Sequence, residues 1–176
     1  MRSPCLQGGE AFALLRERAE QAGVFVLLAG NLGSHHSATP VSAFRRFAIA
    51  DPIAPFIVIN DGDAKAAWSF TLLHELAHLW LGATGVSGGV PEMQIERFCW
   101  DAAGEFCGAA EWRREADKPK GSSGSSCYAV RQHRLGHAML DFARRYTDVG
   151  ALSPSKAAKV LGVTPRSVCP LLALAA

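Results

Sequence analysis

Hydrophobic residues fall into separate short stretches along the first part of the chain. Residues 9–22 place apolar and charged side chains at the spacing of an amphipathic helix, and Gly23 is a typical residue to end it. Three shorter apolar runs, bounded by turn residues, predict strands at 24–28, 44–50 and 55–60. We therefore expect an α+β fold with a small mixed or antiparallel sheet.

The most apolar stretch runs from Ala66 to Gly82 and predicts a helix that is buried on almost all sides. Asp61 or Asp63 is expected to cap the start of this helix, and Gly82 to end it. The few polar residues of the helix need partners, because unpaired polar groups are costly to bury. The pattern therefore predicts a ligand for these polar side chains.

His74-Glu75-Leu76-Ala77-His78, within this helix, has the pattern His-Glu-x-x-His. Two histidines four residues apart lie on one helical face, so both imidazoles can bind a single ion. Glu75 lies where it can accept a proton from a water molecule on that ion. A packing role for the histidines is the alternative, but the helical context favours a metal. The segment predicts the core of a zinc hydrolase site, with Zn²⁺ as the cofactor and Mn²⁺ as the alternative.

A catalytic zinc ion usually has three protein ligands and one open position. Glu96 is the best candidate for the third ligand, because it begins a second predicted helix at 95–106, after a loop rich in Gly and Ser at 82–89. If the two helices run antiparallel, Glu96 returns to the level of His74 and His78. The sequence thus predicts a site of two imidazoles and one carboxylate.

Other residues of the second helix have competing interpretations. Glu105 is the rival third ligand, and Asp101 could instead hold one imidazole in the right tautomer through a hydrogen bond. Cys99 and Cys107 have the chemistry of metal ligands, but such cysteines more often act as small packing residues. We therefore expect Glu96 to be the ligand.

The group that would stabilise the reacting carbonyl oxygen is not identified by the sequence. His35 and His36, in a loop between strands, and Tyr128, further along the chain, are the candidates. Arg45 and Arg46 could bind substrate, but adjacent residues of a strand point to opposite faces. At most one of these two arginines is therefore expected to face the cleft.

The second half of the chain begins with a flexible segment and continues as helices. Residues 115–126 have the Gly- and Ser-rich composition of a linker. This divides the chain into a metallopeptidase domain at 1–114, a linker at 115–127 and a helical region at 128–176. In a helix predicted from residue 128 to 146, His133 and His137 are four residues apart. No glutamate lies between them and no third ligand is near, so a basic surface helix is favoured over a metal site.

Residues 152–174 predict two short helices joined by a turn. Ser153 or Ser155 is expected to start the first helix and Gly162 to end it. A helix, a turn and a helix form the outline of a DNA-binding motif, but Arg166 is the only basic residue of the second helix. Direct nucleic-acid binding is therefore not expected, and we expect this tail to pack on the catalytic part or to recognise a protein partner.

Composition narrows the protein class. The 176 residues, 49% of them hydrophobic, fit one domain or one domain with a small addition. The net charge of +2 gives no strong attraction to nucleic acid or to a membrane. Five scattered cysteines without a Cys-x-x-Cys pair indicate reduced thiols. With no signal-peptide pattern and no apolar stretch long enough to span a membrane, we expect a cytoplasmic protein.

The motif and its surroundings resemble the ImmA/IrrE family of metallo-endopeptidases. The likeness covers most of the chain, and it is carried by the residues at 70–82, 95–99, 103–106, 128–136 and 152–163. The resemblance implies a zincin-like active-site helix packed on a sheet, with His74, His78 and Glu96 as metal ligands and Glu75 as the general base. It also implies a protein substrate, a helix-turn-helix transcriptional repressor whose cleavage relieves repression.

The sequence departs from the family pattern at two places. Trp100, within the expected ligand helix, stands where the family usually has a small polar residue such as Asn, and it could disturb the surroundings of Glu96. Cys107-Gly108-Ala109 replaces an apolar run that ordinarily ends in Pro. The first alternative function is therefore a weak or inactive metal-binding module that sequesters a repressor or toxin. The second, which does not depend on these departures, is a transcription regulator that acts through the tail.

Overall fold

The computed structural model describes residues 8–30, 39–86, 93–107 and 126–173. The chain forms two compact units, Met1–Gly121 and Ser122–Ala176, and each is described by itself. The division falls within the segment expected to be a linker, most of which lies outside the described residues. No described helix has the length and apolar character that crossing a membrane would require.

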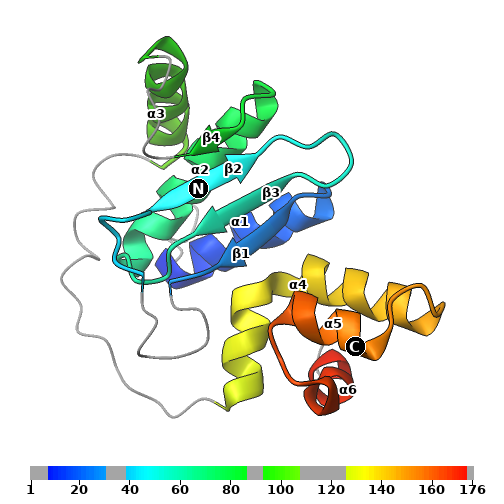
Figure 1. Cartoon of the computed structure of the whole chain (residues 1–176). Coiled ribbons are helices and arrows are strands. Elements are labelled where there is room, and N and C mark those ends of the chain that lie inside the picture. Colours follow the sequence, from blue (N-terminus) through cyan, green and yellow to red (C-terminus); the bar gives the residue numbers. More distant parts are fainter. Residues whose placement is uncertain (1–7, 31–38, 87–92, 108–125, 174–176) are drawn as a thin grey trace, which may run out of the picture. The chain divides into compact units, whose positions relative to one another are not determined.

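In its described residues, the first unit combines three helices with a four-stranded sheet (Figure 1). The strand order is β1-β3-β2-β4, with β1 parallel to β3 and with β2 antiparallel to both β3 and β4. The sheet is therefore mixed, which confirms the predicted α+β fold. The elements in chain order are α1 (Gly8–Gln21), β1 (Phe25–Leu28), β2 (Arg46–Ile49), β3 (Phe56–Ile59), α2 (Lys65–Trp80), β4 (Gly85–Val86) and α3 (Met93–Cys107).

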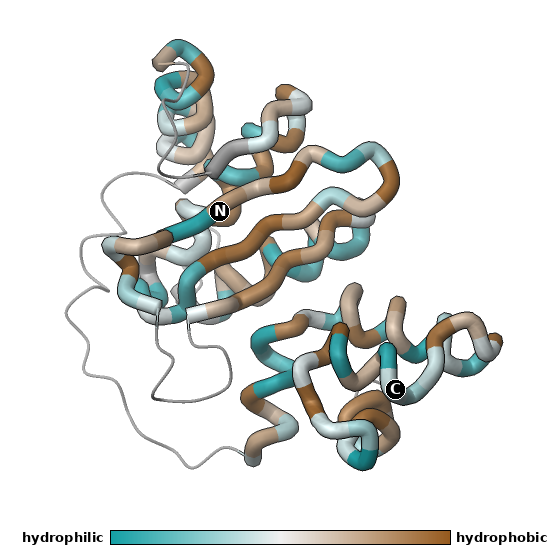
Figure 2. The backbone as a smooth tube through the Cα atoms, viewed as in Figure 1, coloured by the Kyte–Doolittle hydropathy of each residue, from teal (hydrophilic) through white to brown (hydrophobic). Residues whose placement is uncertain are grey.

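The core of this unit lies between one face of the sheet and helices α1 and α2, which both lie behind the sheet in Figure 1. Alternate strand residues face these helices and are buried, among them Val26, Ile57 and Ile59, as expected for a sheet covered on that face. Figure 2 shows the strands β1 and β3 as largely hydrophobic stretches. On the other face Phe25 stacks on Phe56, with ring centroids 4.8 Å apart.

Helix α2 is the central element of the unit, because it packs against the sheet, α1 and α3. Trp68 and Leu72 bury its inner face, and the Trp68 ring packs edge-on against Phe12 of α1. The sequence predicted that this helix is buried on almost all sides, but Trp80, its last residue, is 91% exposed. Gly82 follows the helix with a φ of 66°, a left-handed conformation that glycine adopts without strain, so the predicted end is confirmed.

The expectation that Asp61 or Asp63 caps α2 is wrong. The capping position is Ala64, and no side chain accepts a hydrogen bond from the first turn there. Both carboxylates are engaged elsewhere: Asp63 accepts from the Ala64 N–H and pairs with Arg45, whereas Asp61 accepts from the Gly30 N–H at 2.6 Å. These tertiary contacts tie the loop before α2 to the ends of β1 and β2.

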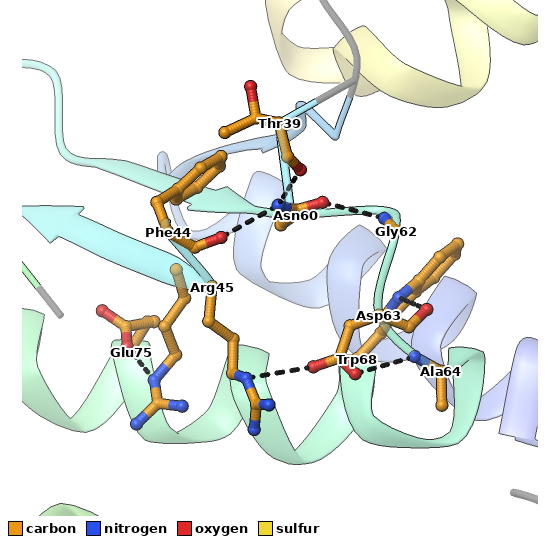
Figure 3. Close-up of polar contacts among 10 residues, drawn as sticks. Thr39, Phe44, Arg45, Asn60, Gly62, Asp63, Ala64, Trp68 and Glu75 are labelled. Carbon is orange, nitrogen blue, oxygen red and sulfur yellow. Dashed lines mark hydrogen bonds and ion pairs between the residues drawn. The ribbon is translucent and has the colours of Figure 1, made fainter. Parts of the chain in front are cut away.

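Asn60, directly after β3, is fully buried and joins two backbone segments (Figure 3). Its side-chain amide donates to the carbonyl oxygens of Thr39 and Phe44 at 3.0 and 2.9 Å, and its side-chain oxygen accepts from the Gly62 N–H at 2.9 Å. Through these bonds Asn60 fixes the chain before β2 relative to the chain before α2.

Replacing Asn60 by Ala is expected to lower the free energy of unfolding, because it removes three hydrogen bonds between a fully buried side chain and partly buried backbone groups. Each such bond contributes about 0.5–1.5 kcal/mol. Chemical denaturation of the variant beside Gln94→Ala, which removes an exposed amide from α3, measures it. Equal unfolding midpoints for the two variants would contradict the stabilising role proposed for Asn60.

Between residues 126 and 173, the second unit forms three helices, α4 (Cys127–Asp148), α5 (Pro154–Leu161) and α6 (Pro165–Ala173). Ser153 caps α5 by accepting from the Lys156 N–H, and Gly162 ends it with a φ of 61°. These boundaries confirm the two short helices expected in the tail. Their buried residues form the inner side of the unit, and they are Ala157, Ala158, Leu161, Val168, Leu171 and Leu172.

Helix α4 covers the predicted range but has a kink that the sequence analysis did not anticipate. Gly136 has φ 76° and ψ 169°, outside the helical region, and it lies between His133 and His137. These histidines are therefore not one regular helical turn apart. Among the described residues the group of potential metal ligands is formed by His74, His78 and Glu96 and does not include these two histidines.

Candidate metal centre

Helices α2 and α3 bring together the three residues that were selected from the sequence as metal ligands. His74 and His78 lie one turn apart on α2, and Glu96 lies in the first turn of α3, which packs against α2. The Nε2 atoms of the two imidazoles are 3.1 Å apart. The Glu96 carboxylate lies 3.4 Å from the Nε2 of His74 and 3.3 Å from that of His78. One donor atom from each residue falls within 4.8 Å of the others.

This donor set fits a divalent cation. Both imidazoles are buried, and they point the same ring nitrogen at one carboxylate. Burial, followed by the nearby charges of Arg46 and His78, lowers the pKa of His74 to about 3, so its imidazole is neutral and can bind a metal through a lone pair. Two imidazoles and one carboxylate are a common ligand set of catalytic zinc. Among the described residues no further His, Cys, Asp or Glu joins this group.

Glu75 occupies the position next to the ligand set but is oriented toward the sheet. Its side chain is 4% exposed, and its Oε1 atom lies 2.7 Å from the Nε of Arg46, the first residue of β2. Burial raises the pKa of Glu75 to about 7, although the charge and hydrogen bond of Arg46 oppose this rise. A buried carboxylate with a raised pKa beside a metal site has the properties of a general base near neutral pH.

Trp100 of α3 forms one wall of the site. Its ring lies 4.9 Å from Phe70 and 5.3 Å from His74, centroid to centroid, and the Arg46 guanidinium lies 5.5 Å from the ring centroid. Trp100 is the residue that departs from the family pattern, a departure that could disturb the surroundings of Glu96. In the structure Glu96 keeps its contacts with both imidazoles while Trp100 packs beside them.

The remaining residues of α3 do not join the ligand group. Glu105 and Asp101 are exposed. The buried Nδ1 atoms of His74 and His78 have no hydrogen-bond partner, so the idea that Asp101 holds an imidazole is wrong in this arrangement. The His74 ring is in contact with the rings of Phe70 and Trp100, and its polar contacts are made through Nε2.

The cysteines of α3 support the packing interpretation where they are described. Cys99 is fully buried, and burial, together with the charges of Glu96 and Glu75, raises the pKa of its thiol to about 11. A thiol that stays protonated is a poor metal ligand. The side chain of Cys107, at the end of α3, lies outside the described residues, as do Gly108 and Ala109.

The candidates for stabilising a carbonyl oxygen lie outside the part of the first unit that the structure describes. His35 and His36 lie outside the described part of the chain. Tyr128 belongs to α4 of the second unit, and its role stays a prediction.

Of the two adjacent arginines only Arg46 contacts the site, which agrees with the expectation that at most one would. Arg45 pairs with Asp63 instead (Figure 3). The signal for Arg46 was present in the sequence as a charge within an apolar strand, but the strand register decides which arginine turns inward.

Comparison with known families agrees with this geometry. The model of a peptidase family described as the IrrE N-terminal-like domain matches residues 19–110, just over half of the 176 residues. The matched region runs from α1 to beyond α3 and includes all the residues of the candidate centre. Searches of curated proteins and of solved structures gave no significant match.

Proposed function

We propose that this chain is a zinc-dependent endopeptidase, from the premise that it belongs to the peptidase family described as the IrrE N-terminal-like domain. Family membership supports a metallopeptidase-like function, and the proposal adds the metal, the residues and the reaction. In it His74, His78 and Glu96 hold the metal and Glu75 is the general base. Zn²⁺ suits two imidazoles and a carboxylate, and Mn²⁺ is the alternative cation.

One observation carries this proposal: two buried imidazoles and a carboxylate from two helices converge within 4.8 Å, with a buried glutamate beside them. Structural zinc sites normally have four protein ligands. A set of three among the described residues therefore favours a catalytic site, with a position left for water or substrate, over a site that only holds the fold together.

The chemistry divides between the cation and the residues of the chain. A bound zinc ion would polarise the scissile carbonyl and lower the pKa of a water molecule. Glu75 accepts one proton from that water as its oxygen bonds to the carbonyl carbon. When the carbon–nitrogen bond breaks, Glu75 passes the proton to the leaving nitrogen. The products are an amine and a carboxylic acid that keeps the second proton of the water until it ionises to solvent.

The proposed substrate is a helix-turn-helix transcriptional repressor, and this part of the proposal derives from the family resemblance. Cleavage would remove the repressor from its operator and relieve repression. The alternative of a non-cleaving module that sequesters a partner predicts the same metal site with no hydrolysis. The two functions therefore differ in a single measurable outcome.

Quantifying new protein N-termini by mass spectrometry in cells that express either the wild-type chain or Glu75→Gln tests the proposal. We expect a small set of new N-termini that depends on the wild-type residue and that includes a helix-turn-helix protein. Identical sets from the two chains would contradict peptidase activity. A wild-type-dependent set without any DNA-binding protein would retain the peptidase and refute the proposed substrate class.

A further inference from the structure

Arg46 is directed into the site by the register of the sheet. It is the first residue of β2 and pairs with Ile59 of β3, whose side chain is buried on the face toward α2. Ala48, two residues later, lies on the same face and is fully buried in the core. Because alternate residues of a strand share a face, the Arg46 side chain enters the layer between the sheet and α2. It is only 11% exposed.

The guanidinium of Arg46 contacts three residues of the candidate centre. Its Nε lies 2.7 Å from Oε1 of Glu75, and its terminal NH2 lies 3.2 Å from Nε2 of His74. The guanidinium carbon lies over the ring of Trp100, 5.5 Å from the ring centroid. One cation thus touches the proposed general base, a proposed metal ligand and the wall of the site.

A fixed positive charge is unfavourable for cation binding at this distance, so a role in holding the metal does not explain it. Peptide hydrolysis, in contrast, develops negative charge on the carbonyl oxygen. Donors fixed near that oxygen before the reaction are among the largest contributions to catalysis. The position of Arg46 therefore matches the charge of the transition state better than the charge of the metal.

The contact with His74 involves the ring nitrogen that a metal would bind. The Nε2 lone pair of His74 cannot accept a hydrogen bond from Arg46 and bind a metal at the same time. If the imidazole bound a metal, the Arg46 NH2 group would exchange this acceptor for another, whereas the Nε contact with Glu75 does not use the His74 lone pair. Glu75 and Trp100 keep the charged guanidinium next to the metal-binding atoms.

We propose that Arg46 is the oxyanion-binding residue of this enzyme: its NH2 group donates to the oxygen of the scissile carbonyl while its Nε tethers Glu75. This inference rests on the proposed peptidase function. As water attacks, the π electrons of the carbonyl move to that oxygen, which becomes the oxyanion bound by Arg46. They return when the carbon–nitrogen bond breaks and the nitrogen takes the proton from Glu75. Trp100 orients the guanidinium, which gives a role to the residue that departs from the family pattern.

The test compares Arg46→Gln and Arg46→Lys with Arg45→Gln, in the full chain. Arg45 is the adjacent arginine, but it is about half exposed and pairs with Asp63 outside the centre. Two affinities are measured for each protein: that for Zn²⁺ alone, by competition with a chelating dye, and that of the zinc-loaded protein for a phosphonamidate dipeptide, by calorimetry. The tetrahedral anion of this probe resembles the oxyanion.

Arg46→Gln is expected to change the two affinities in opposite directions. Zinc should bind about tenfold more tightly once the repelling charge is removed. The phosphonamidate should bind about 10²-fold more weakly, as for the loss of one oxyanion donor. Arg46→Lys keeps the charge but loses the paired donors, so its probe affinity should be intermediate. Arg45→Gln should match the wild type in both measurements.

Several outcomes would overturn the inference. If Arg46→Gln binds both zinc and the probe more weakly, with a lower unfolding midpoint, Arg46 only supports the fold. Equal probe affinity in wild type and Arg46→Gln, or no probe binding by zinc-loaded wild type, would also refute oxyanion binding. None of these results decides whether the wild type cleaves a protein, because the N-terminus measurement tests the proposed function separately.

Discussion

Glu75→Gln is expected to retain the metal and to lose peptide hydrolysis. The amide has nearly the same shape as the carboxylate and can still accept a hydrogen bond from Arg46, so the packing of α2 against β2 should persist. The amide cannot take a proton from water at neutral pH. Because general acid–base catalysis contributes about 10²- to 10⁴-fold, the turnover number should fall by a factor in that range.

The measurement is cleavage of an identified substrate by zinc-loaded protein, with the metal content determined on the same samples. Glu105→Gln is the matched control, because Glu105 lies exposed on α3 outside the ligand group. The control should cleave at the wild-type rate. Wild-type cleavage by Glu75→Gln would refute the general-base assignment, and loss of metal from this variant would indicate that Glu75 supports the metal site itself.

His78→Ala and Glu96→Ala are each expected to lose the metal. In both variants two of the three donors remain, and two protein ligands are too few for a catalytic zinc site of the usual kind. The wild type should hold about one cation per chain. Because a ligand that binds only the folded state stabilises it, zinc at a thousandfold excess over its dissociation constant should add about 4 kcal/mol to wild-type stability. The variants should gain almost none of this.

Elemental analysis of purified proteins and unfolding curves with and without zinc give the two readouts. Glu105→Ala, which removes the rival carboxylate of the same helix, is the control and should bind metal as the wild type does. Metal lost from His78→Ala and Glu105→Ala, but kept by Glu96→Ala, would move the third ligand to Glu105. A wild type that takes up no metal after reconstitution would contradict the metal centre as a whole.

The local part of the site follows from the sequence because it lies within one helix. The four-residue spacing of His74 and His78 equals about one helical turn, so the same face is fixed as soon as the helix is recognised. The apolar surroundings that predict the helix also predict burial, and burial lowers the pKa of His74 so that its imidazole is neutral. The helix end at Gly82 is equally local, since a left-handed residue there depends on the glycine alone.

Expectations that depended on contacts between distant segments were less secure. Asp61 and Asp63 have the residue type of helix caps, but the Gly30 amide and the Arg45 side chain engage them instead. The two-residue strand β4 lies in a stretch whose Gly and Ser content indicated only a loop, because pairing with β2 creates it. The kink at Gly136 likewise interrupts α4, where the sequence pattern predicted one uninterrupted helix.

The sequence by itself determined the helix, the spacing of its two histidines and the glutamate beside them, because these depend on one period of 3.6 residues. Glu96 required an assumption about how two helices pair, and the packing of α3 on α2 supplies that contact. Only the tertiary structure decided that Arg46 and Trp100 meet at Glu75 and His74. They come from a strand and a second helix, and the strand register and helix packing that join them involve residues far apart in the chain.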